Sequence, residues 1–157
     1  FKEFEMKQVY LELILLIERL HRRFLDVVKH ELDRLGIEDI NNVQTLILYN
    51  IGSENLTIGE LTNRGYYLGS NVSYNIKKLV ESEYLIQERS PHDKRSVKVK
   101  LSQKGLDLCQ KIDQLYQRNV DELVDKVLSK DNINQLNNNL KTLEVFWTKW
   151  ISSGNRV

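Results

Sequence analysis

The spacing of apolar residues changes once along the chain, from the period of a helix to the period of strands. Up to residue 83 the apolar residues recur every three or four positions, which predicts helices. Residues 85–90 and 96–101 then predict two strands, because apolar residues in the second strand alternate with Lys98 and Lys100. Only five residues separate these strands, so we expect an antiparallel hairpin that directly follows a helix.

The rest of the chain is predicted to be helical. The expected helices cover residues 4–35, 43–51, 57–64, 70–83, 102–128 and 132–151. Their ends are predicted by glycines and capping residues: Gly36, Asn41 or Asn42, Gly52, Thr57 with Glu60 in a capping box, Ser70 and Ser102. The apolar stripe of the fifth helix reaches Val127, and we expect Lys130-Asp131 to break it.

The charges are distributed unevenly. The chain has 157 residues, with 23 Lys+Arg, 22 Asp+Glu and a net charge of +1. Residues 64–104 carry nine basic and four acidic groups, whereas residues 1–63 carry seven and eleven. The basic segment coincides with the hairpin and the helix before it, which makes a polyanion such as DNA a candidate partner.

The composition argues against several classes of protein. A hydrophobic share of 41% is sufficient for a folded core, which argues against disorder. The single Cys excludes a disulfide framework and a cysteine-rich zinc site. The longest apolar run, at 13–17, is shorter than the ~20 residues that span a bilayer, and no signal-peptide pattern is visible, so a cytoplasmic location is expected.

The expected fold class is mostly α with a small β-wing. Two short helices joined by a tight turn and followed by a hairpin are typical of a winged helix-turn-helix, in which one helix enters the major groove of DNA. On the helix predicted over 70–83, Ser73 and Asn75 lie on the flanks, and five side chains lie opposite the apolar face: Ser70, Asn71, Tyr74, Lys77 and Lys78. The alternative is an ordinary solvated helix face, but the adjacent cationic hairpin favours DNA.

The predicted hairpin tip contains Asp93, Lys94 and Arg95. An Arg at a narrow tip can enter the minor groove, whose negative potential attracts a guanidinium group. Asp93 can hold that guanidinium by an ion pair, and Lys94 adds a phosphate contact. The alternative is an incidental surface ion pair that contributes little.

Four short motifs, taken in order, resemble the MarR family of bacterial transcriptional regulators. They are Leu56-Thr57-Ile58-Gly59-Glu60-Leu61, Ser70-Asn71-Val72-Ser73, Asp93-Lys94-Arg95-Ser96 and Leu101-Ser102-Gln103-Lys104-Gly105. The run from Arg64 to Asn75 looks more narrowly like the PetP/LdtR-type branch of alphaproteobacteria. Two positions depart from the family pattern: Leu68, where many members have a Ser that caps the recognition helix, and Glu83, where a Gly usually ends it.

The resemblance implies one MarR-like domain over 1–157, with a winged helix-turn-helix lobe at 42–104 and a helical dimerisation region at 1–40 and 105–157. It implies an obligate homodimer with interleaved terminal helices, bound to palindromic double-stranded promoter DNA. By the motif match, DNA contacts fall on two sets of residues: Ser70, Asn71, Ser73 and Tyr74 of the recognition helix, and Asp93 and Arg95 of the wing tip.

The apolar stripes favour dimerisation independently of the resemblance. The helices predicted over 4–35, 106–128 and 132–151 carry more apolar surface than a small lobe can cover. Trp147 and Trp150 suit an interface core, where aromatic residues are enriched. The alternative is that these stripes pack only within one chain.

The resemblance also implies a small-molecule effector between the dimerisation helices and the DNA-binding lobe. Pockets of this kind have an apolar lining with a few polar groups. The predicted lining is Leu20, Phe24, Thr45, Leu61, Tyr66 and Tyr67, with Arg19 and Arg22 as partners for an anion. The alternative is that each of these residues is an ordinary packing residue.

No residue pattern indicates catalysis or a cofactor. The three histidines, His21, His30 and His92, form no cluster at metal-ligand spacing, so no metal site is expected. Cys109 faces inward on a predicted helix and is expected to be an inert thiol, although a redox role is the alternative. We therefore expect a ligand-responsive, dimeric DNA-binding regulator. The rival hypotheses are an architectural DNA-binding protein, and an enzyme or ligand-binding scaffold with no DNA role.

Overall fold

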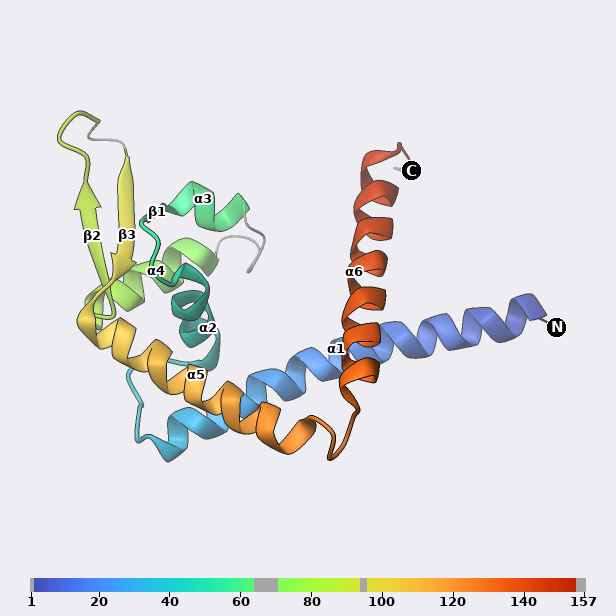
Figure 1. Cartoon of the computed structure of the whole chain (residues 1–157). Helices are drawn as coiled ribbons and strands as arrows, with labels where there is room; N and C mark the ends of the chain where they lie inside the picture. Colours follow the sequence, from blue (N-terminus) through green and yellow to red (C-terminus); the bar gives the residue numbers. More distant parts are fainter. Residues whose placement is uncertain (1, 64–70, 94–95, 155–157) are drawn as a thin grey trace. The chain divides into compact units, whose positions relative to one another are not determined.

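The computed structural model describes residues 2–63, 71–93 and 96–154 and confirms the mostly helical fold with a small β-sheet. The chain divides into two compact units, residues 1–113 and residues 114–157. The first unit contains the winged helix-turn-helix, and Figure 1 shows its helices and hairpin. None of the described helices is long and apolar enough to cross a membrane.

The first helix, α1, spans Lys2–Arg34. It ends where predicted, because Gly36 adopts a left-handed conformation with φ +70° and the N–H of Ile37 donates to the carbonyl of Leu32 at 2.9 Å. The burial of α1 is uneven along its length. Val28 and Leu32 are buried in the first unit, whereas most of the apolar side chains before them are exposed.

The helix α2 spans Asn42–Ile51 and is capped by Asn41, one of the two caps that the sequence suggested. The Asn41 side chain accepts the N–H of Gln44 at 2.8 Å, and the Gln44 side chain accepts the N–H of Asn41 at 3.0 Å. The C-terminal stop at Gly52 is also confirmed, with φ +57°.

The short helix α3 spans Ile58–Asn63, and α4, the predicted recognition helix, spans Asn71–Glu81. The Oγ1 atom of Thr57 accepts the N–H of Glu60 at 3.1 Å, which confirms Thr57 as the cap of α3. The predicted cap of α4, Ser70, lies outside the described residues.

A three-stranded antiparallel sheet follows the order β1-β3-β2. β2 spans Leu85–Arg89 and β3 spans Val97–Leu101, as predicted, and they pair with Gln87 opposite Val99. β1, Leu56–Thr57, was not predicted, because a two-residue strand has no detectable period. In Figure 1, β2 and β3 lie side by side, and α5 starts directly after β3.

One apolar core holds α1, α2, α4, the sheet and the start of α5 together. Its fully buried side chains include Val28, Leu48, Ile51, Ile76, Leu79, Val99 and Ile112. Burial of one such side chain contributes about 1.5–3 kcal/mol. The inner face predicted for the recognition helix is therefore confirmed at Ile76 and Leu79, as it is at Val72.

The last two helices meet at a different place from the one predicted. α5 spans Gln103–Leu123, and α6 spans Lys130–Ser152. Lys130-Asp131 begins α6 instead of breaking a helix, because Ser129 caps that helix by accepting the N–H of Asn132 at 3.1 Å. Val127, expected on the helical stripe, lies in the turn between α5 and α6.

The end of α4 explains how a non-glycine residue replaces the usual cap. Glu83 adopts φ +65°, and the N–H of Tyr84 donates to the carbonyl of Leu79 at 2.9 Å, which is the bond of a left-handed helix cap. The predicted helix therefore stops at Glu81 instead of Glu83. The Glu83 carbonyl is held by the Ser102 hydroxyl at 2.6 Å.

Glu83→Gly should raise the free energy of unfolding by about 1 kcal/mol, because glycine adopts a left-handed conformation without a Cβ penalty. Thermal denaturation should show an increase in Tm of about 2–4 °C for a chain of this size. Asp125→Gly is a matched control, since Asp125 also has φ +61° but accepts the N–H of Lys130 at 3.2 Å. The increase in Tm for Asp125→Gly should be smaller than that for Glu83→Gly. A Tm of Glu83→Gly below that of wild type would contradict the assignment of Glu83 as a left-handed cap.

Candidate nucleic-acid interface

The outer face of α4 presents polar and cationic side chains to solvent. Five residues predicted to contact DNA are exposed on this helix: Asn71, Ser73, Tyr74, Lys77 and Lys78. They lie opposite the buried face formed by Val72, Ile76 and Leu79. Because this face is solvated and lies on a helix narrow enough for the major groove, it can present hydrogen-bonding groups to base edges and phosphates.

Local contacts organise part of this face. The Nζ atom of Lys78 lies 5.7 Å from the ring centroid of Tyr74 and 3.5 Å from a carboxylate oxygen of Glu81. These are exposed contacts and contribute little to stability. They keep the Lys78 ammonium group beside the Tyr74 ring on the outer face.

The strands of the wing are less cationic than the sequence indicated. Lys98 is exposed, as expected. Lys100, in contrast, lies 2.6 Å from a carboxylate oxygen of Glu88 on the neighbouring strand. The hydrogen bond from Lys100, together with its charge, lowers the pKa of the Glu88 carboxyl. The positive charge of Lys100 is therefore largely neutralised by Glu88.

The tip of the wing is described only in part, because Lys94 and Arg95 lie outside the described residues. Asp93 is exposed, and its carbonyl accepts the N–H of Ser96 at 3.1 Å, which closes the turn. The N–H of Ser90 donates to the Ser96 carbonyl at 3.3 Å. The predicted contacts of Lys94 and Arg95 remain predictions.

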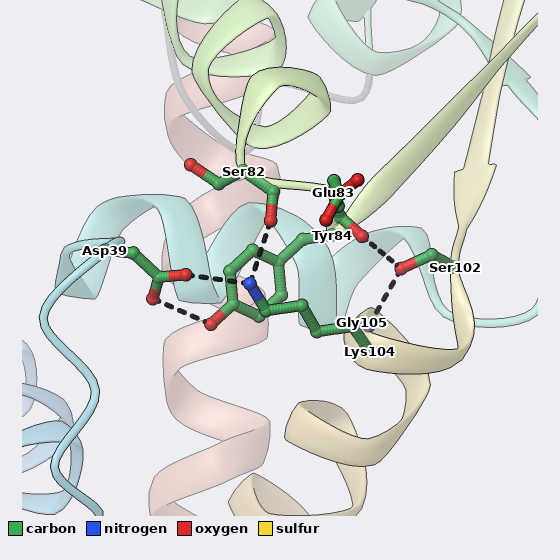
Figure 2. Close-up of polar contacts among 7 residues, drawn as sticks. All are labelled: Asp39, Ser82, Glu83, Tyr84, Ser102, Lys104 and Gly105. Carbon is green, nitrogen blue, oxygen red and sulfur yellow. Dashed lines mark hydrogen bonds and ion pairs between the residues drawn. The ribbon is translucent and has the colours of Figure 1, made fainter.

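A polar cluster fixes the base of the wing (Figure 2). The Nζ atom of Lys104 donates to Asp39 Oδ2 at 2.8 Å and to the carbonyl of Ser82 at 2.9 Å, and it lies 4.3 Å from the ring centroid of Tyr84. The Tyr84 hydroxyl donates to Asp39 Oδ1 at 2.8 Å. We call these residues, Asp39, Ser82, Tyr84 and Lys104, the wing-base cluster. It joins the loop before α2, the end of α4, the start of β2 and the start of α5.

Within the wing-base cluster, the pKa values of Asp39 and Tyr84 are shifted toward the ionisation states in which the hydrogen bonds form. Burial alone would raise the pKa of Asp39, but the hydrogen bonds from Lys104 and Tyr84 and the Lys104 charge lower it below its usual value. Burial, together with the Asp39 carboxylate, raises the pKa of Tyr84. At neutral pH Asp39 is therefore ionised and Tyr84 is protonated, which is the state in which all of these bonds form.

Asn75 differs from its predicted place on the flank of the recognition helix. Its side chain is buried, and its Oδ1 atom accepts a hydrogen bond from Gln44 Nε2 of α2 at 3.2 Å. The burial of Asn75 was not predicted, because a helical wheel gives the angle of a residue on its own helix and not the position of the helix packed against it. The sequence analysis named Asn41 or Asn42 as the cap of α2, and nothing in that prediction pointed to a contact of Gln44 with α4.

The residues predicted to line an effector pocket have contrasting environments. Leu20 and Phe24 are exposed on α1, with 57% and 38% of their surface accessible. Thr45 and Leu61 are buried, and the Thr45 hydroxyl donates to the carbonyl of Asn41 at 2.8 Å. Tyr66 and Tyr67 lie outside the described residues.

Two surface depressions lie near these residues. Arg19 and Arg22 line an open groove of about 310 Å³ on α1, together with Arg23 and Asp26. A second groove, of about 530 Å³, lies between the end of α1 and the start of α2, and Asn41 is among its lining residues. Of the predicted pocket residues that the structure describes, none lines this second groove.

The described residues contain no group of three or more His, Cys, Asp or Glu side chains that could hold a metal ion. Cys109 is half-buried in α5, and its burial and the Asp113 charge raise its pKa to about 11. The thiolate is the reactive form of cysteine. The thiol of Cys109 is therefore a weak nucleophile at neutral pH.

We expect Cys109 to react slowly with a thiol-specific reagent at pH 7. The reaction rate should rise as the pH approaches 11, because the fraction of thiolate then increases. A stopped-flow pH series on the folded protein measures this, with the urea-unfolded chain as the reference. Rapid modification of the folded protein at pH 7 would support a redox role instead.

Comparisons with known proteins agree with this geometry. Residues 38–96 match the model of the MarR family. The exopolysaccharide II synthesis transcriptional activator ExpG of Rhizobium meliloti (strain 1021) is 45% identical over 100 residues, which cover 64% of this chain. The matched region spans about half of that relative, 52% of its length. The HTH-type transcriptional regulator MhqR of Bacillus subtilis (strain 168) is 24% identical over 136 residues, 87% of this chain and 92% of MhqR.

Solved structures share the fold. Streptococcus pneumoniae FabT in complex with DNA has a TM-score of 0.74 at 18% identity, covering 89% of this chain and 98% of that one. A MarR mutant from E. coli complexed with operator DNA has a TM-score of 0.69 at 24% identity, covering 84% and 93%. The S. aureus MepR–DNA complex has a TM-score of 0.70 at 19% identity, covering 85% and 96%.

Proposed function

We propose that the chain is a sequence-specific DNA-binding transcriptional regulator of the MarR family, whose model matches residues 38–96. The observation that supports the proposal most strongly is the exposure of polar and cationic side chains on the outer face of α4. There, Asn71, Tyr74 and Lys77 are exposed on the helix that precedes the wing. Hydrogen-bonding groups that face solvent on such a helix read base edges, while the lysines contact phosphates.

We propose that the regulator is a homodimer on a palindromic operator. Large apolar side chains are exposed along α1 and α6, among them Phe4, Leu16, Leu20, Phe146 and Trp150. The helix α6 has no buried residue in the single chain. Large apolar side chains left exposed along a helix mark an interaction site. A second copy would cover it and would pair two recognition helices for two half-sites.

The wing completes the proposed DNA contact. Arg95 enters the minor groove beside the recognition helix, and Asp93 holds its guanidinium group. Lys94 contributes a phosphate contact, and Ser70 extends the contacts at the start of α4. We also propose that the chain belongs to the PetP/LdtR-type branch of the family. We further propose that it is located in the cytoplasm and has no enzyme activity.

We further propose control by a small-molecule effector. Arg19 and Arg22 provide cationic groups on α1 for an anionic ligand, and Leu20 and Phe24 provide exposed apolar surface. A ligand that binds one spacing of the DNA-binding lobes more tightly than another would lower operator affinity. Thermal shift with a ligand library is the direct screen, because a ligand that binds the folded state raises Tm.

Two substitutions on α4 test the mode of DNA binding. Asn71→Ala should reduce the preference for a selected operator about tenfold, because it removes a base-reading group. Lys77→Ala should instead weaken binding to all duplexes alike and reduce the salt dependence by about one released counterion. Lys141→Ala on α6 is the matched control and should change neither. Fluorescence anisotropy across a salt series measures both quantities.

The alternative function is nonspecific or architectural DNA binding without ligand control. The basic segment at 64–104 favours it, since cationic surface binds any duplex. The two functions differ in the effect of Asn71→Ala. An architectural protein would show equal losses, or none, on selected and scrambled DNA.

A further inference from the structure

A buried amide pair joins the recognition helix to α2. Gln44 of α2 and Asn75 of α4 are both buried, and Gln44 Nε2 donates to Asn75 Oδ1 at 3.2 Å. The Oε1 atom of Gln44 accepts the backbone N–H of Asn41 at 3.0 Å. Because Gln44 is bonded through both its oxygen and its nitrogen, the orientation of its amide plane is fixed by contacts on two elements.

The rest of the buried face of α4 is apolar. It consists of Val72, Ile76 and Leu79, whose packing is not directional. Across residues 2–63, 71–93 and 96–154, the Gln44–Asn75 bond is the only hydrogen bond between a side chain of Asn71–Glu81 and a side chain of a different helix, because the bond from Lys104 goes to the backbone carbonyl of Ser82 after α4 has ended. It is therefore the contact of α4 that depends most steeply on the rotation of this helix about its own axis.

Asn75 lies at the border between the buried and exposed faces of α4. It is four residues after Asn71 and three before Lys78, so the three side chains are neighbours on the helix surface. A rotation of α4 that breaks the amide bond also turns Asn71 and Lys78 away from their places. The buried pair and the proposed DNA contacts are thus coupled through one rigid helix.

We propose that Gln44 and Asn75 are positioning residues that set the rotation of α4 for base reading without touching DNA. This inference rests on the proposed function, since it concerns the same DNA-binding face. Direct readout requires hydrogen bonds of narrow geometry, so a small rotation costs discrimination more than it costs overall affinity. A satisfied buried polar pair is suited to specifying one arrangement of two packed helices.

The double variant Q44L/N75L tests the inference, because it removes both polar groups of the buried pair together. It also removes the acceptor of the Asn41 N–H, so the change in Tm is measured beside the affinity ratio. The probe is a duplex selected by the wild-type chain from random-sequence DNA, compared with a scrambled duplex of equal length. We expect the ratio of the two affinities to fall about tenfold, the discrimination that one good base contact supplies. Binding to the scrambled duplex should remain near the wild-type value.

Two conservative variants keep the test independent of folding. Q44E retains the acceptor for the Asn41 N–H but replaces the Nε2 donor with an oxygen that faces Asn75 Oδ1, so its affinity ratio should fall although the cap of α2 is kept. N75S loses the bond to Gln44 but leaves a polar group and space for a water molecule. Its ratio of affinities for the selected and scrambled duplexes should therefore fall, even if Q44L/N75L does not fold. Circular dichroism melting accompanies each measurement.

The matched control is Tyr49→Phe. It removes a hydrogen bond between the same helix, α2, and Asp113 of α5, where the Tyr49 hydroxyl donates to Oδ1 at 2.5 Å. It should lower Tm without changing the affinity ratio. An unchanged ratio in N75S or Q44L/N75L, or an equal loss in Tyr49→Phe, would overturn the positioning role alone. A wild-type ratio near one would overturn the proposed function, and the positioning role with it.

Discussion

Replacing Gly105 with Ala should lower the free energy of unfolding of the first unit by about 2–3 kcal/mol, the upper part of the range for overpacking a core. A Cβ atom at Gly105 would lie 2.4 Å from the carbonyl oxygen of Tyr84. That oxygen cannot move away freely, because it accepts the N–H of Ser102 at 3.0 Å. The strain therefore has to shift the start of α5 away from β2.

Such a shift would also disturb the wing-base cluster. Lys104 precedes Gly105 directly, and its ammonium group bonds both Asp39 and the carbonyl of Ser82 (Figure 2). The Gly105 N–H donates to the Ser102 hydroxyl at 3.1 Å, which in turn holds the Glu83 carbonyl. One added methyl group thus acts on several hydrogen bonds at the base of the wing.

Thermal denaturation measures this effect, and a fall in Tm of about 4–12 °C is expected from the usual shift per kcal/mol for a chain of this size. Gly59→Ala is the matched control, because Gly59 lies in α3 and a Cβ there would meet only Thr57 Oγ1 at 3.9 Å. The control should be neutral or stabilise the protein by up to about 1 kcal/mol. A Tm of Gly105→Ala equal to that of wild type would contradict the close approach.

Replacing Phe146 and Trp150 together with Ser should raise the dimer dissociation constant at least about 100-fold. Each ring is about half exposed in the single chain, with 52% and 53% of its surface accessible, and the two ring centroids lie 5.9 Å apart. Aromatic anchors at the centre of an interface typically cost about 2 kcal/mol or more when truncated, so two of them account for this change.

Sedimentation equilibrium measures the dimer directly, and operator binding should fall with it, because two half-sites require two recognition helices. Lys141→Ser is the control, since Lys141 lies five residues before Phe146 and faces the other side of α6. Its dimer should match that of wild type. If the Phe146 and Trp150 variant remains a dimer at nanomolar concentration, α6 does not form the interface.

The parts of the fold that depend on neighbouring residues were predictable from the sequence. Gly36, Asn41 and Ser102 act within a few residues of their own positions, so their spacing is sufficient to predict the caps they make. The period of the strands likewise predicted β2 and β3. The exposed residues of α4 followed from helical spacing alone.

Contacts between distant residues were not predictable. Asp39 and Lys104 are 65 positions apart, and nothing in either neighbourhood marks the other as its partner. The same holds for Gln44 and Asn75, which are 31 positions apart. The break after α5 was misplaced because Ser129 caps a helix that begins at Lys130, and Asp131 in its first turn is favourable to the helix dipole.

The affinity of the purified protein for a selected palindromic duplex, relative to a scrambled duplex of equal length, tests the central claim most directly. Titrations from low to physiological salt separate sequence reading from phosphate attraction, because only the phosphate contribution is strongly screened. A sequence-specific regulator should prefer the palindrome by about a thousandfold or more at physiological salt. A ratio near one across the salt series would contradict the account.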